Sequence, residues 1–345
     1  MEFPQVLIFD GDDENAAAAE LAAQVSALGL NAPLVLASQH GSHLAAQLAS
    51  SETVASPAHR ADQEWASELG ARARRAGADA VVAVGGGRCL DIAKLAAARA
   101  GLPSIAVPTQ LSHDGICSPV AVVPNEHGRA ESVGAIAPRV VFIAIPTLIR
   151  APAASLRAGI GDLLANPLAL RDWALAAQHG LEEIDQRAWD LSVESFETIE
   201  DDLNRPVDEL AGKPEFARRL ANALVLSGLA MIWSGTSRPA SGGEHEISHA
   251  IDELYGGRAM HGEQVAFGCT VSVALYGEDT DAFRGRLRNL GLPDHPRDLG
   301  LSSDDMVQLL LHAPDTRPGR FTILEDATLD EAGAGKLVSR IWGQP

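Results

Sequence analysis

The chain has 345 residues, more than one hydrophobic core of ordinary size needs, so we expect two domains. Hydrophobic residues make up 46% and charged residues 21% of the chain, which is typical of a folded globular protein and excludes a disordered one. The formal net charge of −19 argues against a nucleic-acid partner, because phosphate backbones bind basic surfaces. It is compatible with a local pocket for a phosphorylated small molecule.

The first 150 residues alternate short apolar runs with alanine-rich amphipathic segments. We predict strands at residues 5–9, 33–37, 80–84, 104–107 and 140–144, and helices at residues 15–28, 43–49, 63–76 and 90–100. The run at 80–84 is apolar throughout, as in a strand that is buried on both faces. Strands that alternate with helices predict a Rossmann-like, mostly parallel sheet covered by helices on both faces.

After Pro152 the strand pattern fades. We predict helices at residues 156–172, 173–180, 188–201, 216–233, 243–254 and 264–276, with more helix up to the carboxyl end. The expected fold class is therefore α/β plus all-α. It has a dinucleotide-binding α/β domain at residues 1–150 and a helical metal- and substrate-binding domain at residues 151–345. We expect the active site in the cleft between them.

The cysteines and the amino-terminal segment bear on the cellular compartment. Cys89, Cys117 and Cys269 are odd in number and widely spaced, which favours a reducing cytoplasm over a disulfide framework. The first residues lack the pattern of a signal peptide, and no apolar run reaches the length of a membrane span. We expect a cytoplasmic protein without a membrane partner.

Three glycines, Gly85, Gly86 and Gly87, separate a predicted buried strand from a helix. Without Cβ atoms this backbone can approach a pyrophosphate, and the N–H groups that begin the helix can bind it. The alternative is a tight turn that binds nothing. Asp91 lies on the same helix, where a cofactor contact competes with an exposed ion pair to Lys94.

The second predicted strand runs into Ser38, Gln39 and His40 and not into an acidic residue. An acidic residue at that place would hold the ribose of NAD and repel the extra phosphate of NADP. Its absence favours use of both dinucleotides, or of NADP.

A polar loop follows the predicted strand at 104–107 and contains Thr109, Ser112, His113 and Asp114. Thr109 and Ser112 could bind the cofactor, and Asp114 could orient a substrate hydroxyl. The alternative is a polar capping loop, which such residues often form.

Three histidines lie close together in the helical half. His245 and His249 are four residues apart and share one face of a predicted helix, and His261 begins the next helix. Imidazoles that converge from two helices suit Zn²⁺ or a similar cation, and Asp162, which lies among small residues, is the best candidate for a carboxylate ligand. Buried structural histidines are the alternative interpretation.

Five motifs follow one another in chain order: GGG-x-x-x-D-x-A-K, P-T-x-x-S-H-D-G, G-D-x-x-x-N-x-x-A-x-x-D-W, S-R-P-A-S-G-x-E-H-x-x-S-H and H-G-E-Q-V. Together they resemble the glycerol-1-phosphate dehydrogenase family, part of the superfamily of iron-containing alcohol dehydrogenases, glycerol dehydrogenase and dehydroquinate synthase. The matching segments cover about half of the chain, from Gly85 to Gly268.

The resemblance implies reversible reduction of dihydroxyacetone phosphate to sn-glycerol 1-phosphate with NAD(H) or NADP(H), in a homo-oligomer. It implies one divalent metal, usually Zn²⁺ with Ni²⁺ or Fe²⁺ as alternatives. The residues that the resemblance and the patterns assign are, for the metal, Asp162, His245 and His261; for the cofactor, Gly85, Gly86, Gly87, Asp91, Thr109 and Ser112; and for catalysis and substrate binding, His249 and Asp114.

The expected mechanism combines a metal that polarises the substrate carbonyl with His249, or a water that it orients, as the source of the proton. Arg238 could bind the substrate phosphate, and a structural salt bridge is its alternative role. Arg88 and Cys89 stand where many family members have Lys-Pro, and SGGEH replaces SGSEH. Another polyol or polyol phosphate therefore remains an alternative substrate, and a non-redox cyclase that resembles dehydroquinate synthase remains an alternative function.

Overall fold

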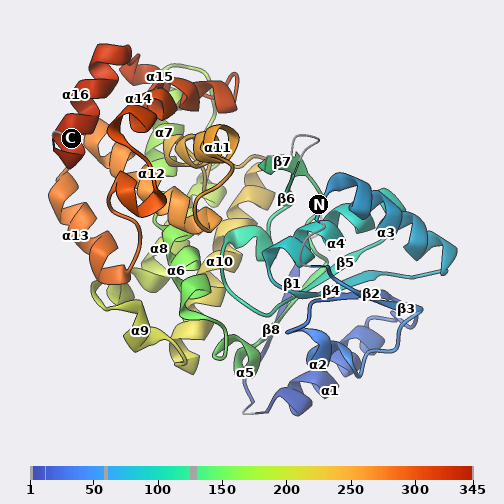
Figure 1. Ribbon diagram of the computed structural model, residues 1–345. Helices are drawn as coiled ribbons and strands as arrows, with labels where there is room; N and C mark the ends of the chain where they lie inside the picture. Colours follow the sequence, from blue (N-terminus) through green and yellow to red (C-terminus); the bar gives the residue numbers. More distant parts are fainter. Residues whose placement is uncertain (1–2, 12, 58–60, 125–129, 344–345) are drawn as a thin grey trace.

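The computed structural model describes residues 3–11, 13–57, 61–124 and 130–343 (Figure 1). The strands are β1 (Gln5–Phe9), β2 (Leu34–Ala37), β3 (Glu52–Ala55), β4 (Val81–Gly85), β5 (Ser104–Pro108), β6 (Val120–Pro124), β7 (Ala130–Gly134) and β8 (Val140–Ala144). The helices of the same part are α1 (Glu14–Ala27), α2 (Ser42–Ala45), α3 (Gln63–Arg75) and α4 (Gly87–Ala100), with the short turn η1 (Asp114–Ile116).

All regular elements in the rest of the described chain are helical. They are α5 (Ile145–Leu148), α6 (Ala153–Leu163), α7 (Asn166–Gln178), α8 (Gln186–Glu200), α9 (Val207–Leu210), α10 (Pro214–Ser234), α11 (Gly243–Tyr255), α12 (His261–Leu275), α13 (Thr280–Leu290), α14 (Ser303–His312), α15 (Ile323–Ala327) and α16 (Glu331–Trp342). The short 3₁₀ turns are η2 (Asp201–Asn204), η3 (Pro296–Leu299) and η4 (Ala313–Thr316). None of the helices in this described part is long and apolar enough to cross a membrane.

Six strands form one parallel sheet in the order β1-β8-β5-β4-β2-β3. The central strands β4, β5 and β8 are buried along their whole length, as their continuous apolar sequences predict. Helices α1 and α2 cover one face of the sheet, and α3 and α4 cover the other (Figure 1). The predicted Rossmann-like sheet is confirmed, and Gly85 of β4 lies opposite Pro108 of β5, so the loops after these strands are neighbours.

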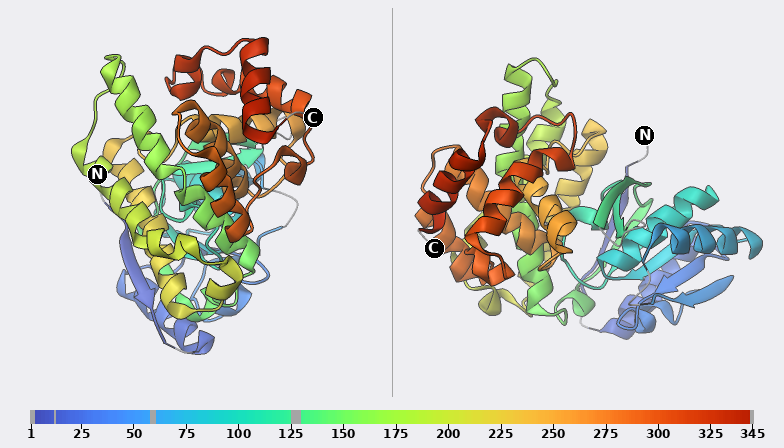
Figure 2. Two further views of the ribbon diagram at one scale, coloured as in Figure 1. Left: turned by 90° about the vertical axis from the view of Figure 1, so that its left-hand side faces the viewer. Right: turned by 45° about the horizontal axis from the view of Figure 1, so that its top comes forward.

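The helical half lies beside the sheet, and the β6–β7 hairpin stands between the two (Figures 1 and 2). Within the helical half, α12 packs against both α6 and α11. Glycine permits this close packing, because a Cβ on Gly262 would collide with the carbonyl oxygen of Ala158, and one on Gly161 with that of Gly262. The fold thus brings the carboxyl end of α6 against the first turn of α12. The division into domains at residue 150 stays a prediction.

Several sequence predictions differ from the structure. The helix predicted at 156–172 is broken, since α6 ends at Leu163 and α7 begins at Asn166 and continues through the helix predicted separately at 173–180. Pro167 is the cause, because proline fits the first turn of a new helix and lacks the N–H that a continuous helix would need. The short α2 also ends before the predicted residue 49.

Strand β3 and the hairpin of β6 and β7 were not among the predicted elements. In β3 only Val54 is buried. This is expected of an edge strand that contributes a single apolar side chain to the core. In β6 buried and half-buried residues alternate, so a period of two was present in the sequence.

Candidate active site

Three side chains from three helices converge on one point. Asp162 lies in α6, His245 in the first turn of α11, and His261 at the start of α12. Oδ1 of Asp162 lies 3.7 Å from Nε2 of His245 and 3.7 Å from Nε2 of His261. All three candidate ligand atoms lie within 4.8 Å of one another. Two imidazole nitrogens and a carboxylate oxygen are a donor set that Zn²⁺ and similar cations accept, with positions left open for a substrate.

The groups behind these side chains orient them. Nδ1 of His245 lies 3.0 Å from Oε1 of Glu244, which leaves Nε2 free to face Asp162. The other oxygen of Asp162, Oδ2, accepts a hydrogen bond from the backbone N–H of Asp114 at 2.9 Å. Metal-binding histidines in proteins are commonly held in this way by a carboxylate on the second ring nitrogen. The cluster therefore fits a divalent cation both in its donors and in the contacts that fix them.

The charge of the cluster also favours a cation. Burial raises the pKa of Asp162, but the hydrogen bond with His245 and the electrostatic effect of the neighbouring histidines outweigh burial and hold the pKa below its ordinary value. Burial lowers the pKa of His261 to about 3, so this ring is neutral at pH 7. His245 is buried as well, yet Asp162 and Glu244 on either side raise its pKa. A cation at this point would take the place of the proton that these carboxylates attract.

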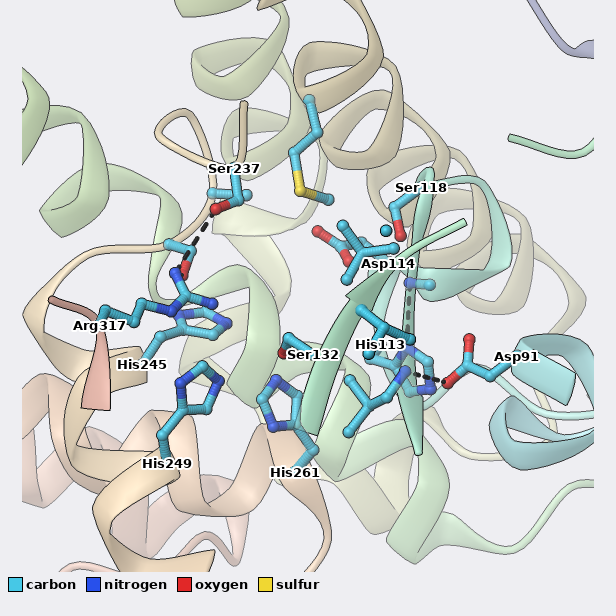
Figure 3. Close-up of a pocket in the computed structure, with 18 residues that line it drawn as sticks. Asp91, His113, Asp114, Ser118, Ser132, Ser237, His245, His249, His261 and Arg317 are labelled. Carbon is cyan, nitrogen blue, oxygen red and sulfur yellow. Dashed lines mark hydrogen bonds between the residues drawn. The ribbon is translucent and has the colours of Figure 1, made fainter. Parts of the chain in front are cut away.

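A cavity of about 220 Å³ opens at the cluster and is lined by residues from both halves of the chain (Figure 3). This volume lies below the roughly 300–1,000 Å³ of pockets for drug-sized ligands, and it suits a small substrate. His249, Asp114 and His113 line it together with His245 and His261. The hairpin contributes Val120, Val122, Ser132, Val133 and Gly134 to the lining.

Two predicted catalytic residues, Asp114 and His249, lie in this cavity with shifted acidities. Burial and the charge of Asp162 raise the pKa of Asp114 to about 7, against the effect of a 2.8 Å hydrogen bond from Oγ of Ser227. Burial and the charge of Arg317 lower the pKa of His249 well below its usual range. At neutral pH His249 is therefore an uncharged imidazole, and Asp114 titrates near the pH at which proton exchange with a hydroxyl is most effective.

His113 was part of a predicted polar loop but was not assigned a role. Its Nδ1 accepts a hydrogen bond from the N–H of Gly115 at 2.9 Å, and its ring meets that of His261 edge-on at 6.4 Å between centroids. Its Nε2 lies so close to Gly87 that a Cβ on this glycine would collide with it. His113 thus links the glycine loop to the cluster of Asp162, His245 and His261. The P-T-x-x-S-H-D-G motif placed it near the site, but only the pairing of β4 with β5 brings it to Gly87.

A second cavity, of about 690 Å³, lies at the carboxyl ends of the strands. Gly86, Gly87 and Thr109, all predicted to bind the cofactor, line it. Its wall also contains Ser38, Gln39 and His40 from the end of β2, where no acidic residue stands. Because Gly87 contacts His113, which lines the first cavity, the two cavities adjoin at this pair.

Other predicted cofactor residues are placed differently. Gly85 is the last residue of β4, and Ser112 is buried; among the described residues, neither is part of the lining of the two cavities. Asp91 lines the smaller cavity, where its Oδ1 pairs with Nζ of Lys94 at 2.9 Å and its Oδ2 accepts from the N–H of Val122 at 3.1 Å. The alternative of an exposed Asp91–Lys94 pair is wrong, since both side chains are buried under the β6 strand.

Arg238 is buried and lies outside the lining of the small cavity. Its Nη2 lies 2.9 Å from Oε1 of Glu182, and its Nη1 donates to the carbonyl oxygen of Phe321 at 2.7 Å. Arg317, which follows the histidine motifs by more than fifty residues and was not predicted, lines the cavity instead. No local pattern around Arg317 points to this position, which depends on how η4 packs against α11.

Comparisons with known proteins bear on the family of the chain. The family described as iron-containing alcohol dehydrogenase matches residues 13–152. A glycerol-1-phosphate dehydrogenase [NAD(P)+] from Cenarchaeum symbiosum is 38% identical over 262 residues, which cover 76% of this chain and 72% of the relative. Its counterpart from Methanospirillum hungatei is 39% identical over 267 residues, 77% of this chain and 72% of the relative.

Solved structures of lower identity share the fold. A probable glycerol dehydrogenase from Sinorhizobium meliloti superposes with a TM-score of 0.80 at 23% identity, covering 98% of this chain and 96% of that one. Maleylacetate reductase from Agrobacterium tumefaciens superposes with a TM-score of 0.73 at 20% identity, over 99% and 97% of the two chains. These similarities concern the arrangement of the sheet and of the helical half.

Proposed function

The chain belongs to the glycerol-1-phosphate dehydrogenase family, within the iron-containing alcohol dehydrogenases, and on this premise we propose that it reduces dihydroxyacetone phosphate to sn-glycerol 1-phosphate with NADH or NADPH. The observation that carries the proposal is the cluster of Asp162, His245 and His261 at a small cavity that adjoins a larger one along the glycine loop. A hydride can pass only between sites that adjoin in this way.

We propose that the larger cavity binds the dinucleotide. The N–H groups at Gly86 and Gly87, at the start of α4, would bind the pyrophosphate, and Thr109 would contact the adjoining part of the cofactor. Gly85 would shape the turn and Ser112 would support the loop, while Asp91 would hold β6 over α4 and not contact the cofactor. The wall at Ser38, Gln39 and His40 would accept the 2′-phosphate of NADP as well as the hydroxyl of NAD. In this proposal residues 1–150 form the dinucleotide-binding domain and residues 151–345 the metal- and substrate-binding domain.

We propose that Asp162, His245 and His261 hold one divalent cation, with Zn²⁺ first and Ni²⁺ or Fe²⁺ as alternatives. When bound, such a cation supplies a Lewis acid for the substrate carbonyl, and the nicotinamide supplies the hydride. The helices α6, α11 and α12 fix the three donors. The neutral ring of His249 would bind a substrate hydroxyl, and Asp114, with its pKa near 7, would exchange the proton with it.

One experiment distinguishes the proposed reaction from the alternative reactions. Protein stripped with a chelator and resupplied with Zn²⁺, Ni²⁺ or Fe²⁺ would be assayed for oxidation of NADH and of NADPH with dihydroxyacetone phosphate. We expect steady, metal-dependent consumption of both dinucleotides. A preference for unphosphorylated dihydroxyacetone would indicate a polyol dehydrogenase, and binding of NAD without net consumption would indicate a non-redox cyclase.

We further propose that the protein forms a homo-oligomer. Strand β1 is an edge strand of the sheet, and Ile8 in it is exposed, as are Phe3 and Trp233, whose rings stack at 5.0 Å between centroids. Light scattering after size-exclusion chromatography would measure the mass, and a mass equal to one chain would contradict the proposal.

A further inference from the structure

A pair of arginines beside the substrate cavity carries no role in the proposed function. We propose that Arg317, together with Ser237 and Ser241 and supported by Arg320, forms a binding site for a phosphate monoester, and that Arg317 selects phosphorylated substrates. The inference rests on the proposed function for the identity of the substrate. It goes beyond it by naming the residues that bind the phosphate.

The contacts of Arg317 favour an anion as its missing partner. Its Nη1 donates to Oγ of Ser241 at 2.7 Å and to Oγ of Ser237 at 3.5 Å. Arg320 donates to Oγ of Ser237 at 3.1 Å and to the carbonyl oxygen of Ser241. Within the described chain, no carboxylate oxygen lies within 4.0 Å of either guanidinium. Two adjacent positive charges are thus hydrogen-bonded to neutral oxygens, and the carboxyl groups of Glu244 and Glu246 act on them only from a longer distance.

The arginines and serines of this site have more N–H and O–H donors than the described residues offer acceptors for. A guanidinium has five N–H donors, and the hydrogen bonds of Arg317 involve only Nη1. Nε of Arg320 is buried without an acceptor among the described residues. The hydroxyls of Ser237 and Ser241 accept from the arginines and keep their own hydrogens to donate. A phosphate has several acceptor oxygens and matches a forked guanidinium in geometry, so it would use these donors together.

The position of the proposed phosphate site within the cavity would orient a substrate. Arg317, Ser237 and Ser241 line the same cavity as His245 and His249 (Figure 3). In the figure Arg317 and Ser237 lie on one side, above His245, while Asp114 and Asp91 lie on the other. The cavity therefore has one side with an unpaired cation, Arg317, and an opposite side with carboxyl groups and, among the described residues, no unpaired cation. A small molecule with a phosphate at one end and a carbonyl at the other would be oriented by this difference.

Other donors near the cavity are already occupied. At the start of α11, the N–H of Gly242 donates to Glu244 at 2.5 Å and that of Gly243 donates to Asp172 at 2.7 Å. Nζ of Lys94 is paired with Asp91 and with backbone carbonyls. The charge of Arg238, considered from sequence as the phosphate ligand, is paired with Glu182. Among the described cations at this cavity, Arg317 is the one that lines it without an anionic partner.

The test compares Arg317→Gln and Arg317→Lys with the wild type and with a control variant, Arg286→Gln, which removes an exposed arginine of α13. Binding of inorganic phosphate to each metal-loaded protein, without substrate, would be measured by titration calorimetry. Kinetics with dihydroxyacetone phosphate and with unphosphorylated dihydroxyacetone would follow, and circular dichroism and metal content would be compared.

We expect Arg317→Gln to lose phosphate binding and to raise KM for dihydroxyacetone phosphate by about 30-fold or more, since it removes one partner of a buried charged contact. KM for dihydroxyacetone should rise much less than KM for dihydroxyacetone phosphate, because that molecule has no phosphate to lose, whereas any effect of the Arg317 charge on His249 is common to both ketones. Arg317→Lys should recover part of the binding, since lysine keeps the charge but lacks the fork. Arg286→Gln should match the wild type.

Phosphate binding by Arg317→Gln equal to that of the wild type would overturn the inference. So would an equal rise in KM for both ketones, which would mean a structural role. If Arg317→Gln does not fold, Ser237→Ala, which removes one hydroxyl, must still weaken phosphate binding severalfold, and unchanged binding would overturn the inference. If the wild type binds phosphate through Arg317 but turns over no ketone phosphate with any metal, the site stands and the proposed function fails.

Discussion

At the carboxyl edge of the sheet the candidate site consists of backbone and of small residues, whereas across the cavity it consists of long side chains from three helices. Gly86 and Gly87 offer space and N–H groups. Asp162, His245 and His261 offer ligand atoms, and buried groups such as Glu244 fix them. Added atoms should therefore impair function at the sheet edge of the site (the sheet wall), and removed atoms should impair it at the helical side (the helical wall). The predictions below test this difference.

The largest effect is expected at the helical wall, from His245→Ala. The variant should lose stoichiometric metal, and kcat/KM should fall by about 1,000-fold, because a Lewis acid contributes several kcal/mol to the transition state. Metal analysis after dialysis and steady-state kinetics would measure both. His43→Ala, at an exposed position of α2, is the matched control. If His245→Ala retained metal and activity, the helical wall would not be a metal site and the proposed difference between the two walls would be wrong.

Adding one carbon at the sheet wall should come next. In Gly87→Ala the new Cβ would meet Nε2 of His113, so the ring or the loop must move. We expect kcat/KM for the reduced dinucleotide to fall by up to about 100-fold, as displacements of about 1 Å at a site can cause, with metal content unchanged. Gly335→Ala in α16, where a Cβ meets no atom within 4 Å, is the control. Loss of metal in Gly87→Ala would show that the two walls are not independent.

A substitution of Glu244, which contacts His245 from behind the helical wall, should have a smaller effect. Glu244→Gln keeps the size of the side chain but removes the charge beside Nδ1 of His245. Metal affinity should fall about 10–100-fold, the usual cost of losing such an orienting partner. Competition with a chromophoric chelator would measure it. An affinity equal to that of the wild type would mean that the orientation of His245 does not depend on this carboxylate.

The smallest effect concerns a second buried carboxyl of α11. Burial and the charge of Glu325 raise the pKa of Glu246 to about 9, and Oγ1 of Thr322 donates to its Oε2 at 3.0 Å. The folded state thus holds a proton that the unfolded state releases near pH 4.5, so this stability is complete below pH 4.5 and is lost as the pH rises toward 9.

Glu246→Gln should therefore weaken the decline of stability with pH. Between pH 6 and pH 8 the variant should gain about 1–2 kcal/mol relative to the wild type, since each pH unit in this window corresponds to at most about 1.4 kcal/mol. Urea denaturation of both metal-saturated proteins at the two pH values would measure it. Parallel pH dependence of wild type and variant would show that Glu246 is ionised throughout.

Local patterns were enough for much of this molecule. Continuous apolar runs gave the central strands β4, β5 and β8, and the spacing of His245 and His249 gave the helical face beside the cavity. The structure also brings Asp162 to His245 and His261, although α6 is remote from both in sequence. Its small neighbours and the motif resemblance, and not periodicity, singled out that aspartate.

What sequence patterns could not give depends on contacts between distant segments. The position of His113 against Gly87 follows from the pairing of β4 with β5, and that of Arg317 in the cavity follows from packing of η4 on α11. Asp91 and Lys94 have the spacing of an exposed helical pair, and only the hairpin that covers α4 buries them. The break between α6 and α7 has a local signal, Pro167, although the apolar spacing around it predicts one continuous helix.

The glycine-mediated crossing of α6 and α12 has a consequence for the life of the protein in a cell. Because Gly161 and Gly262 leave no side chain between these helices, a cation held by Asp162 and His261 would also tie together two segments about a hundred residues apart. A ligand that binds only the folded state stabilises it by mass action. When the metal is scarce, the chain would unfold more often and be degraded sooner, so metal supply would set the abundance of the protein as well as its activity.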